Sequence, residues 1–257
     1  MRILALLTLL ATPAMALDGP QTPLEDPFKS GMWGYHQVEL LGDPANIQFD
    51  DRVIVTAPDF AEDAFHVPVL VDASQIPDVK RIMLSVDYGP VPRILNYYPE
   101  DADAKIAFRF KIDQSTPVRA AVETHAGTWH IGGVEIDAAG GGCTAPAAAY
   151  ANSDWEERLG EVHGRIWPDT GRLRMVVSHP MDTGLADGIP IFIIEELSVS
   201  APDGQALGRV EMFEPVNEDP ALTLYFDDKM LGDHVLVAGR DNNGNEIEAV
   251  LQSYPTQ

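Results

Sequence analysis

Apolar and polar residues alternate in short stretches along most of this chain, and this pattern restricts the fold more than any other feature of the sequence. In the clearest stretch, Ile106, Phe108, Phe110 and Ile112 alternate with charged or small residues. Successive side chains of a β-strand point to opposite faces, so the stretch predicts one buried and one solvated face. Many such stretches, separated by turn residues, predict antiparallel β-sandwiches.

The alternating stretches form two groups along the chain. In the first group we expect strands over 52–56, 66–72, 79–86, 93–98, 106–112, 117–123 and 128–136. In the second we expect strands over 162–167, 172–178, 189–200, 206–214, 221–226, 234–241 and 246–251. A single helix is expected over about 28–41, with Asp26 as its N-cap and Pro27 at its first position.

A stretch of small residues separates the two groups, and its composition is typical of a linker. Each group has roughly 100 residues, the usual size of an immunoglobulin-like sandwich. The predicted fold class is therefore all-β: two immunoglobulin-like antiparallel β-sandwiches with a short N-terminal helix. The predicted organisation is a signal peptide at 1–16, an N-terminal helical segment at 17–49, a first sandwich at 50–137, a Gly/Ala-rich arm and linker bearing Cys143 at 138–156, and a second sandwich at 157–257.

The beginning of the chain has the parts of a secretory signal peptide. Arg2 gives it a positive start, an apolar run follows to Thr12, and the small residues Ala14 and Ala16 mark a cleavage site. The apolar run is too short to span a bilayer. We therefore expect the mature protein to be exported through the general secretory route.

The chain is strongly acidic, with 17 Lys and Arg against 40 Asp and Glu and a formal net charge of −23. Such a charge repels nucleic acids and anionic lipid surfaces, so we expect neither nucleic-acid binding nor membrane insertion. The same negative field is expected to raise the pKa of a cysteine thiol, because it disfavours the thiolate.

Cys143 is the only cysteine, so it has no partner for an internal disulfide. It follows Gly140, Gly141 and Gly142, which predict a flexible arm, and its small neighbours predict an exposed thiol rather than a packed one. A thiolate can attack an electrophilic sulfur, a disulfide or an activated carbonyl and later release the adduct. These features predict a covalent carrier with Cys143 as the attachment residue.

Other chemistries have weaker support in the sequence. No histidine is spaced so as to place a base beside Cys143, which argues against catalysis by this thiol. His179 and Met181 could join it as copper ligands, but the three residues are not bunched in one loop, and His179 is better explained as a turn residue. No pattern predicts another metal, a nucleotide or any other cofactor.

Several motifs resemble one known family in their order along the chain. They are the segment 53–58, the run 67–69, the run 79–82, Asn96 after the bend at 90–92, the Gly-Gly-Cys element after the last strand of the first half, the segment 178–184 and the run 190–194. The chain resembles the SoxYZ sulfur carrier of periplasmic thiosulfate oxidation, and most closely the fused, single-chain form associated with quinoprotein dehydrogenases. The resemblance covers roughly residues 50–252, with a SoxY-like first half and a SoxZ-like second half.

The resemblance implies a periplasmic carrier, not an enzyme, made of two immunoglobulin-like sandwiches. Cys143 would hold a sulfur-containing intermediate, with Gly140, Gly141 and Gly142 as its flexible arm. The implied partners are periplasmic redox enzymes or cytochromes, including a quinoprotein alcohol dehydrogenase system. This chain departs from the family pattern in one respect: it continues beyond Cys143, so the arm is tethered at both ends.

A second hypothesis remains open from the sequence alone. The two halves could form an immunoglobulin-like binding module that docks a periplasmic dehydrogenase or cytochrome, with Cys143 incidental. The broad acidic surface and the lack of a base near the thiol fit this hypothesis. An adduct on Cys143 would distinguish the carrier from the binding module.

Overall fold

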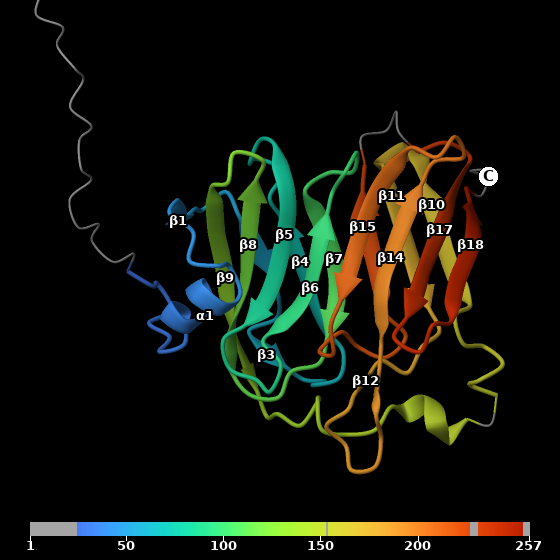
Figure 1. Ribbon diagram of the computed structural model, residues 1–257, viewed down its shortest axis with the longest axis horizontal. Coiled ribbons are helices and arrows are strands. Elements are labelled where there is room, and N and C mark those ends of the chain that lie inside the picture. The colour runs from blue at the N-terminus through green and yellow to red at the C-terminus, as the bar shows by residue number, and fades with distance from the viewer. Residues whose placement is uncertain (1–24, 153, 227–230, 254–257) are drawn as a thin grey trace, which may run out of the picture.

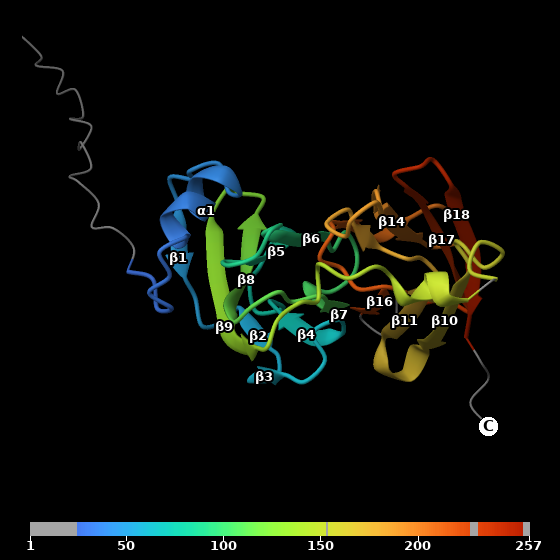
Figure 2. The same ribbon diagram turned by 90° about the horizontal axis from the view of Figure 1, so that it is seen from below.

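Two β-sheets face each other along the whole protein, which the computed structural model describes over residues 25–152, 154–226 and 231–253 (Figures 1 and 2). Within these residues the larger sheet has ten strands and the smaller has six. A hairpin of two short strands projects at one end of the sandwich (Figure 1). The predicted all-β fold class with one short helix is confirmed.

Strands from the first half of the chain form one side of each sheet, and strands from the second half form the other side. The larger sheet runs β1 (Ile47–Phe49), β9 (Trp129–Ala138), β8 (Thr116–Thr124), β5 (Val79–Val86), β6 (Arg93–Tyr98), β15 (Ala206–Met212), β14 (Ile194–Ser200), β17 (His234–Asp241) and β18 (Glu246–Gln252), and β3 (Phe60–Ala61) also pairs with β9. The smaller sheet runs β10 (Val162–Trp167), β11 (Arg172–Val177), β16 (Ala221–Tyr225), β7 (Lys105–Phe110), β4 (Val67–Asp72) and β2 (Ile54–Thr56). The hairpin consists of β12 (Asp182–Thr183) and β13 (Ile191–Phe192), and the helices are α1 (Trp33–Glu39) and two 3₁₀ turns, Ala148–Ala151 and Pro168–Thr170.

Both sheets continue from the first half of the chain into the second. In the larger sheet β6 pairs with β15, and in the smaller sheet β7 pairs with β16, both antiparallel. The Glu211 carboxylate also accepts hydrogen bonds across this seam from the Asn96 side chain and the Tyr98 hydroxyl. The two predicted sandwiches are therefore joined edge to edge through backbone hydrogen bonds, which fixes one half relative to the other.

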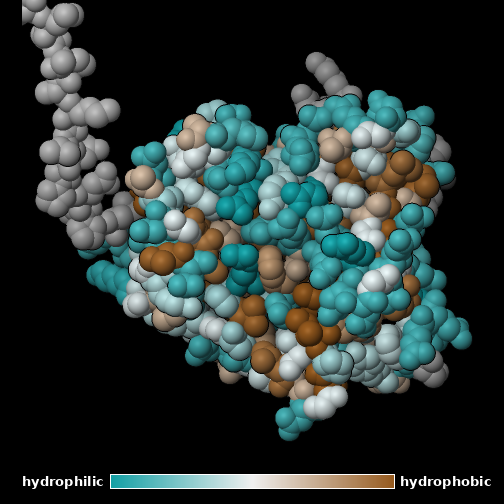
Figure 3. Space-filling model, viewed as in Figure 1, coloured by the Kyte–Doolittle hydropathy of each residue, from teal (hydrophilic) through white to brown (hydrophobic). Residues whose placement is uncertain are grey.

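One cluster of buried apolar side chains fills the space between the sheets throughout the described residues. Val71 and Ile82 come from the first half, and Leu173 and Leu224 come from the second; none of the four is measurably exposed. Burying a side chain of this size contributes about 1.5–3 kcal/mol. The outer face of the larger sheet is largely hydrophilic, with smaller apolar areas between (Figure 3).

The strand predictions agree closely with the structure. The predictions for 79–86, 93–98, 162–167 and 234–241 match the observed bounds, and most others differ by one or two residues at an end. The prediction of one continuous strand over 189–200 is wrong, because the segment is split at Ile193 into β13 and β14. The backbone of Ile193 bonds to Asn242, in the turn between β17 and β18, through both its N–H and its carbonyl, and so leaves the ladder.

The N-terminal helix is shorter than predicted, and Asp26 does not cap it. The helix α1 starts after Met32, which caps it without a side-chain bond. Asp26 instead accepts hydrogen bonds from the backbone N–H groups of Phe28 and Ser30. The predicted signal peptide lies outside the described residues, and no helix among the described residues is long and apolar enough to cross a bilayer.

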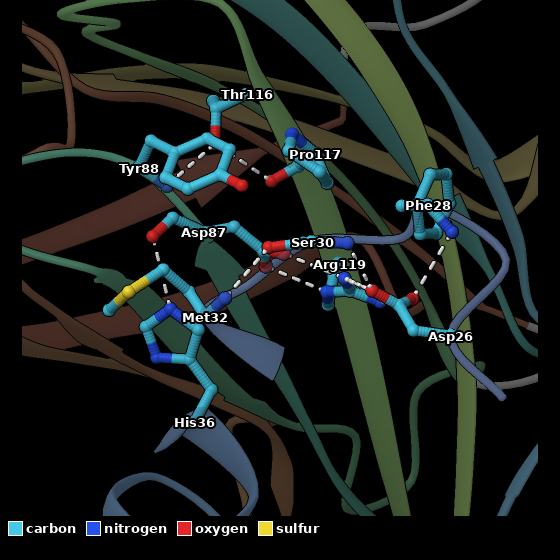
Figure 4. A network of polar contacts seen from close by, with 10 residues as sticks. All are labelled: Asp26, Phe28, Ser30, Met32, His36, Asp87, Tyr88, Thr116, Pro117 and Arg119. Atoms are coloured by element: carbon cyan, nitrogen blue, oxygen red, sulfur yellow. Dashed lines mark hydrogen bonds and ion pairs between the residues drawn. The ribbon is translucent and has the colours of Figure 1, made fainter. Parts of the chain in front are cut away.

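A buried arginine anchors this N-terminal segment to the larger sheet (Figure 4). Arg119 on β8 is 1% exposed and lies between the carboxylates of Asp87 and Asp26, with nitrogen–oxygen distances of 2.6–2.9 Å. Its guanidinium also lies over the rings of Phe28 and Trp33. Paired, hydrogen-bonded and stacked in this way, the charge can be buried.

Residues 139–152 cross one end of the sandwich, from the first half to the second (Figures 1 and 2). They leave the end of β9 and reach the 3₁₀ turn Ala148–Ala151, on the side where the β12–β13 hairpin projects. The hairpin, the loop after β7 and the arm thus meet at this end of the molecule.

Candidate functional site

The glycines before Cys143 hold the arm against the end of the first half. Gly140 and Gly141 have positive φ angles of 93° and 89°, which favour glycine. The N–H of Gly142 donates to the carbonyl of Ile112 at 3.0 Å, and a Cβ added at Gly142 would lie 2.2 Å from the carbonyl oxygen of Ala64. In the structure Gly140 and Gly142 therefore permit close backbone packing, and the flexibility expected of Gly140, Gly141 and Gly142 stays a prediction.

Cys143 is buried, so the predicted exposure of its thiol is wrong. The residue is only 4% exposed, its thiol donates to the carbonyl of Lys111 at 3.6 Å, and its own carbonyl accepts from the Thr183 hydroxyl at 2.7 Å. The loop at Tyr88 and Pro90 lines the narrow space beside the sulfur. The thiol is thus covered by a loop and held by polar backbone groups at the sandwich end, outside the main apolar cluster.

The electrostatics of this position keep the thiol protonated. Burial raises the pKa of Cys143 to about 11, against a smaller opposing effect of the Lys111 charge. Lys111 is itself buried, which lowers the pKa of its ammonium group, and it donates a hydrogen bond to the carbonyl of Met181. Since thiolate is the nucleophilic form, Cys143 is unreactive while the arm stays in this position.

A cavity of about 250 Å³ lies on the other side of the arm. Its walls come from the loop around Phe65 and His66, from Lys111, from the arm residues 145–148 and from Glu218. The Glu218 carboxylate accepts the N–H of Ala148 at 2.6 Å, and burial raises its pKa. Lys111 lines both this cavity and the space at the thiol.

The segment 178–184 is the surface on which the arm rests. Thr183 bonds to the backbone of Cys143, and the Asp182 carboxylate accepts hydrogen bonds from the N–H of Ala147 and the hydroxyl of Tyr150. The family resemblance in the sequence includes this segment but implies only a framework role for it. No local pattern marks Asp182 or Thr183 as partners of an arm that lies about 40 residues earlier in the chain.

His179 is a turn residue, as the sequence interpretation has it. Its Nδ1 accepts the N–H of Met181 at 3.0 Å, and its Nε2 lies 3.6 Å from the Asp241 carboxylate. The sulfur of Met181 accepts the N–H of Ile194 at 3.2 Å. In the described ranges no three His, Cys, Asp or Glu side chains gather as metal ligands.

The burial of His179 predicts a loss of stability in mild acid. Burial lowers the pKa of His179 to about 4, despite the nearby Asp241 carboxylate, whereas the ordinary value is 6.5. Between these values the unfolded chain binds a proton that the folded protein does not, so stability falls as the pH drops below 6.5. Between pH 7 and pH 5.5 we expect a loss of about 1 kcal/mol that the variant His179→Gln lacks, measured by urea unfolding. Equal pH slopes in the two proteins would contradict this prediction.

Two family models match the chain, one in each half. Residues 37–143 match the model described as sulfur oxidation protein SoxY, and residues 168–252 match the model described as sulphur oxidation protein SoxZ. The first match begins in α1 and ends at Cys143. The second covers strands of both sheets from β11 to β18.

One solved structure, the sulfur carrier protein SoxY from Chlorobium limicola f thiosulfatophilum, is 19% identical to this chain. The alignment covers 42% of this chain and 96% of that one, with a TM-score of 0.37, which is too low for the likeness to add to the family matches. Among curated proteins none matches this chain.

Proposed function

Because this chain is a SoxY domain fused to a SoxZ domain, we propose that it carries a sulfur-containing intermediate covalently on Cys143. The observation that carries this proposal is the place of Cys143, which is the chain's single cysteine and the last residue of the SoxY match. The protein itself supplies the thiol, and partner enzymes supply the catalysis.

Loading first requires that the arm leave its closed position. Opening breaks the bonds of Gly142 to Ile112 and of Cys143 to Lys111 and Thr183. Exposure to water, or to a positive charge in a partner's site, lowers the thiol pKa and produces the reactive thiolate. The closed position protects the unloaded thiol from oxidation between encounters.

The chemistry of loading determines the kind of partner. Joining the Cys143 thiol to the outer sulfur of thiosulfate forms one sulfur–sulfur bond and releases one proton and two electrons. An oxidising partner must accept those electrons, so a periplasmic redox enzyme or cytochrome fits the role. Hydrolysis of the adduct then releases sulfate and leaves a persulfide on Cys143, and transfer of the outer sulfur to a partner's thiol frees the Cys143 thiol for another cycle.

Two further parts of the proposal rest on the sequence. The signal-peptide pattern at the start of the chain supports export to the periplasm. The link to a quinoprotein dehydrogenase system rests on the resemblance to the fused carriers alone. Deleting the chain and measuring growth on methanol or other alcohols, alongside growth on thiosulfate, would separate these two metabolic settings.

We predict that protein purified from its native host bears an added mass on Cys143. Intact-mass spectrometry should show the addition in the wild type and not in Cys143→Ser, because no second thiol is present. Treatment of the wild-type sample with a thiol reductant should remove the addition, which serves as the chemical control. A bare thiol in cells grown on reduced sulfur, with unchanged growth of Cys143→Ser, would contradict the carrier.

The burial of Cys143 favours the alternative function, an immunoglobulin-like module that docks a periplasmic dehydrogenase or cytochrome. In that case the thiol is a packing residue, and the end of the sandwich around the arm is a rigid surface. Cys143→Ser would then leave partner binding and growth unchanged. The intact mass of the purified protein and the growth of Cys143→Ser therefore decide between the two functions.

A further inference from the structure

The outer face of the smaller sheet is positively charged, although the protein as a whole is strongly negative. Along β7, Lys105 and Arg109 alternate with the buried Ile106 and Phe108, so both charges point outward. The same alternation applies to the neighbouring strands. The charged side chains on the outward side of the six strands are Lys105, Arg109, Arg165, Arg172 and Arg174, with Asp72 as the one carboxylate.

These basic residues lie side by side across the two halves of the chain. Arg165 pairs with Arg174 in the register of β10 and β11, Arg174 pairs with Thr223 on β16, and Thr223 pairs with Ala107 on β7. Small and neutral side chains such as Ala107 and Thr223 thus lie between the arginines. Together they line a groove of about 700 Å³ over β2, β4, β7, β16 and β11. These strands form the lower layer in Figure 2.

Among the described residues, the arginines that line this groove lack carboxylate partners. Within the described part of the chain, Arg109, Arg172 and Arg174 form no ion pair, whereas the one carboxylate, Asp72, is occupied by Lys105 at 2.6 Å. The Arg172 guanidinium lies 4.1 Å from the centre of the Trp167 ring, and its Nε is buried without a hydrogen-bond partner. A guanidinium stacked in this way is held in place while its N–H edge stays able to bind a carboxylate.

The groove adjoins the cavity beside the Cys143 arm. Pro68 on β4 and Arg109 on β7 line the groove. His66 and Lys111, each two residues away along the chain and just beyond the end of its strand, line the cavity. The carbonyl of Lys111 also accepts the Cys143 thiol. A partner bound in the groove therefore lies next to the arm, at the end of the sandwich where the thiol must emerge.

We propose that this groove docks an acidic, carboxylate-rich segment of a partner protein. Charge complementarity supports this occupant: the six strands carry five outward basic side chains and one outward carboxylate, in a chain whose net charge of −23 repels acidic partners elsewhere. The groove extends across strands from both halves of the chain, which suits an extended polypeptide. The inference that docking orients the partner toward the arm rests on the proposed carrier function. Binding of the acidic segment in the groove does not depend on that function.

The test uses a fluorescein-labelled peptide of about ten glutamates at low salt, where exposed charges are least screened. Fluorescence anisotropy should show saturable binding to the full-length protein. The double variant Arg109→Gln and Arg174→Gln, which removes two exposed charges, should weaken binding by about tenfold or more. The matched control is Lys80→Gln with Arg240→Gln, which removes two exposed charges from the larger sheet. The control should weaken binding by about twofold or less.

Three results would overturn the proposal. They are no saturable binding by the wild type, an equal loss in the control, or equally strong competition by a short thymidine oligonucleotide. The last result would assign the face to polyanions in general rather than to carboxylates. The measurement is repeated with Cys143→Ser, whose binding should equal that of the wild type. If Cys143 carries no adduct, peptide binding in the groove is therefore still expected. If the groove binds no acidic peptide, the carrier function of Cys143 is still untouched.

Discussion

Replacing Arg119 with methionine is expected to destabilise the protein by about 3–5 kcal/mol, because the change leaves a buried carboxylate without its partner. The Asp87 side chain is completely buried, and both of its oxygens accept hydrogen bonds from Arg119. Methionine keeps much of the side-chain volume, so the loss comes from the charge rather than from a cavity. Urea unfolding, followed by tryptophan fluorescence, measures the change in the free energy of unfolding.

The control for this prediction is Arg240→Met, which removes an exposed arginine that lies 3.4 Å from Glu195. Exposed pairs contribute about 0–1 kcal/mol, so this variant should unfold almost like the wild type. A similar small effect for Arg119→Met would contradict the role of the buried network. Asp87 also begins the loop that covers Cys143, so Arg119→Met should also increase the labelling rate of this thiol.

Replacing Gly142 with alanine is expected to displace the arm from its packed position and expose Cys143. The added Cβ would lie 2.2 Å from the carbonyl oxygen of Ala64 and 2.7 Å from that of Ile112, and neither backbone group can move aside cheaply. In the wild type the buried thiol, with its pKa of about 11, should react with iodoacetamide at pH 8 roughly 10–100-fold more slowly than a free cysteine. Gly142→Ala should recover most of that difference.

Gly141→Ala is the matched control in the same arm. A Cβ at Gly141 meets nothing within 4 Å, although the positive φ of this residue adds some strain. Its labelling rate should therefore lie much closer to that of the wild type. Slow labelling of both variants would mean that the glycines do not hold the thiol in place, and that burial of Cys143 depends on the covering loop alone.

The raised thiol pKa also predicts how labelling of the native protein depends on pH. The rate should keep rising up to about pH 11, whereas a free cysteine, with a pKa of about 8.5, approaches its plateau by about pH 10. In Gly142→Ala the plateau should move to lower pH, because exposure relieves the desolvation of the thiolate. An unchanged profile would contradict the displacement of the arm.

The strands were predictable because their signal is local. In β7 the alternation of apolar residues, and in β5 and β17 a short apolar run, each bounded by turn residues, are sufficient to locate the strand. The short strands β1 and β3 were missed because two or three residues carry no measurable period. The split at Ile193 was missed because its cause is Asn242, nearly 50 residues away along the chain.

The sequence identifies Cys143 as the lone thiol and shows the glycines before it, but it does not reveal how they pack. Small neighbouring residues predict an exposed thiol, whereas Cys143 is buried. In the structure Gly142 is small so that the backbone can approach Ala64 closely, which is the opposite consequence of the same residue type. The pairing of Lys111 and Thr183 with the arm depends on contacts far apart in the chain, which no local pattern encodes.

Local side-chain order along the chain was enough to determine the β-strands, the division into two halves and the position of one thiol after a row of glycines. Only the tertiary structure decided that both sheets run unbroken through the two halves, that the thiol is covered, and that Arg109, Arg172 and Arg174 lie along one groove without an ion pair among the described residues. The physical reason is the distance along the chain over which each interaction acts. Alternation and turn preference act between neighbouring residues, whereas strand pairing, burial and charge clustering depend on which distant segments the fold brings into contact.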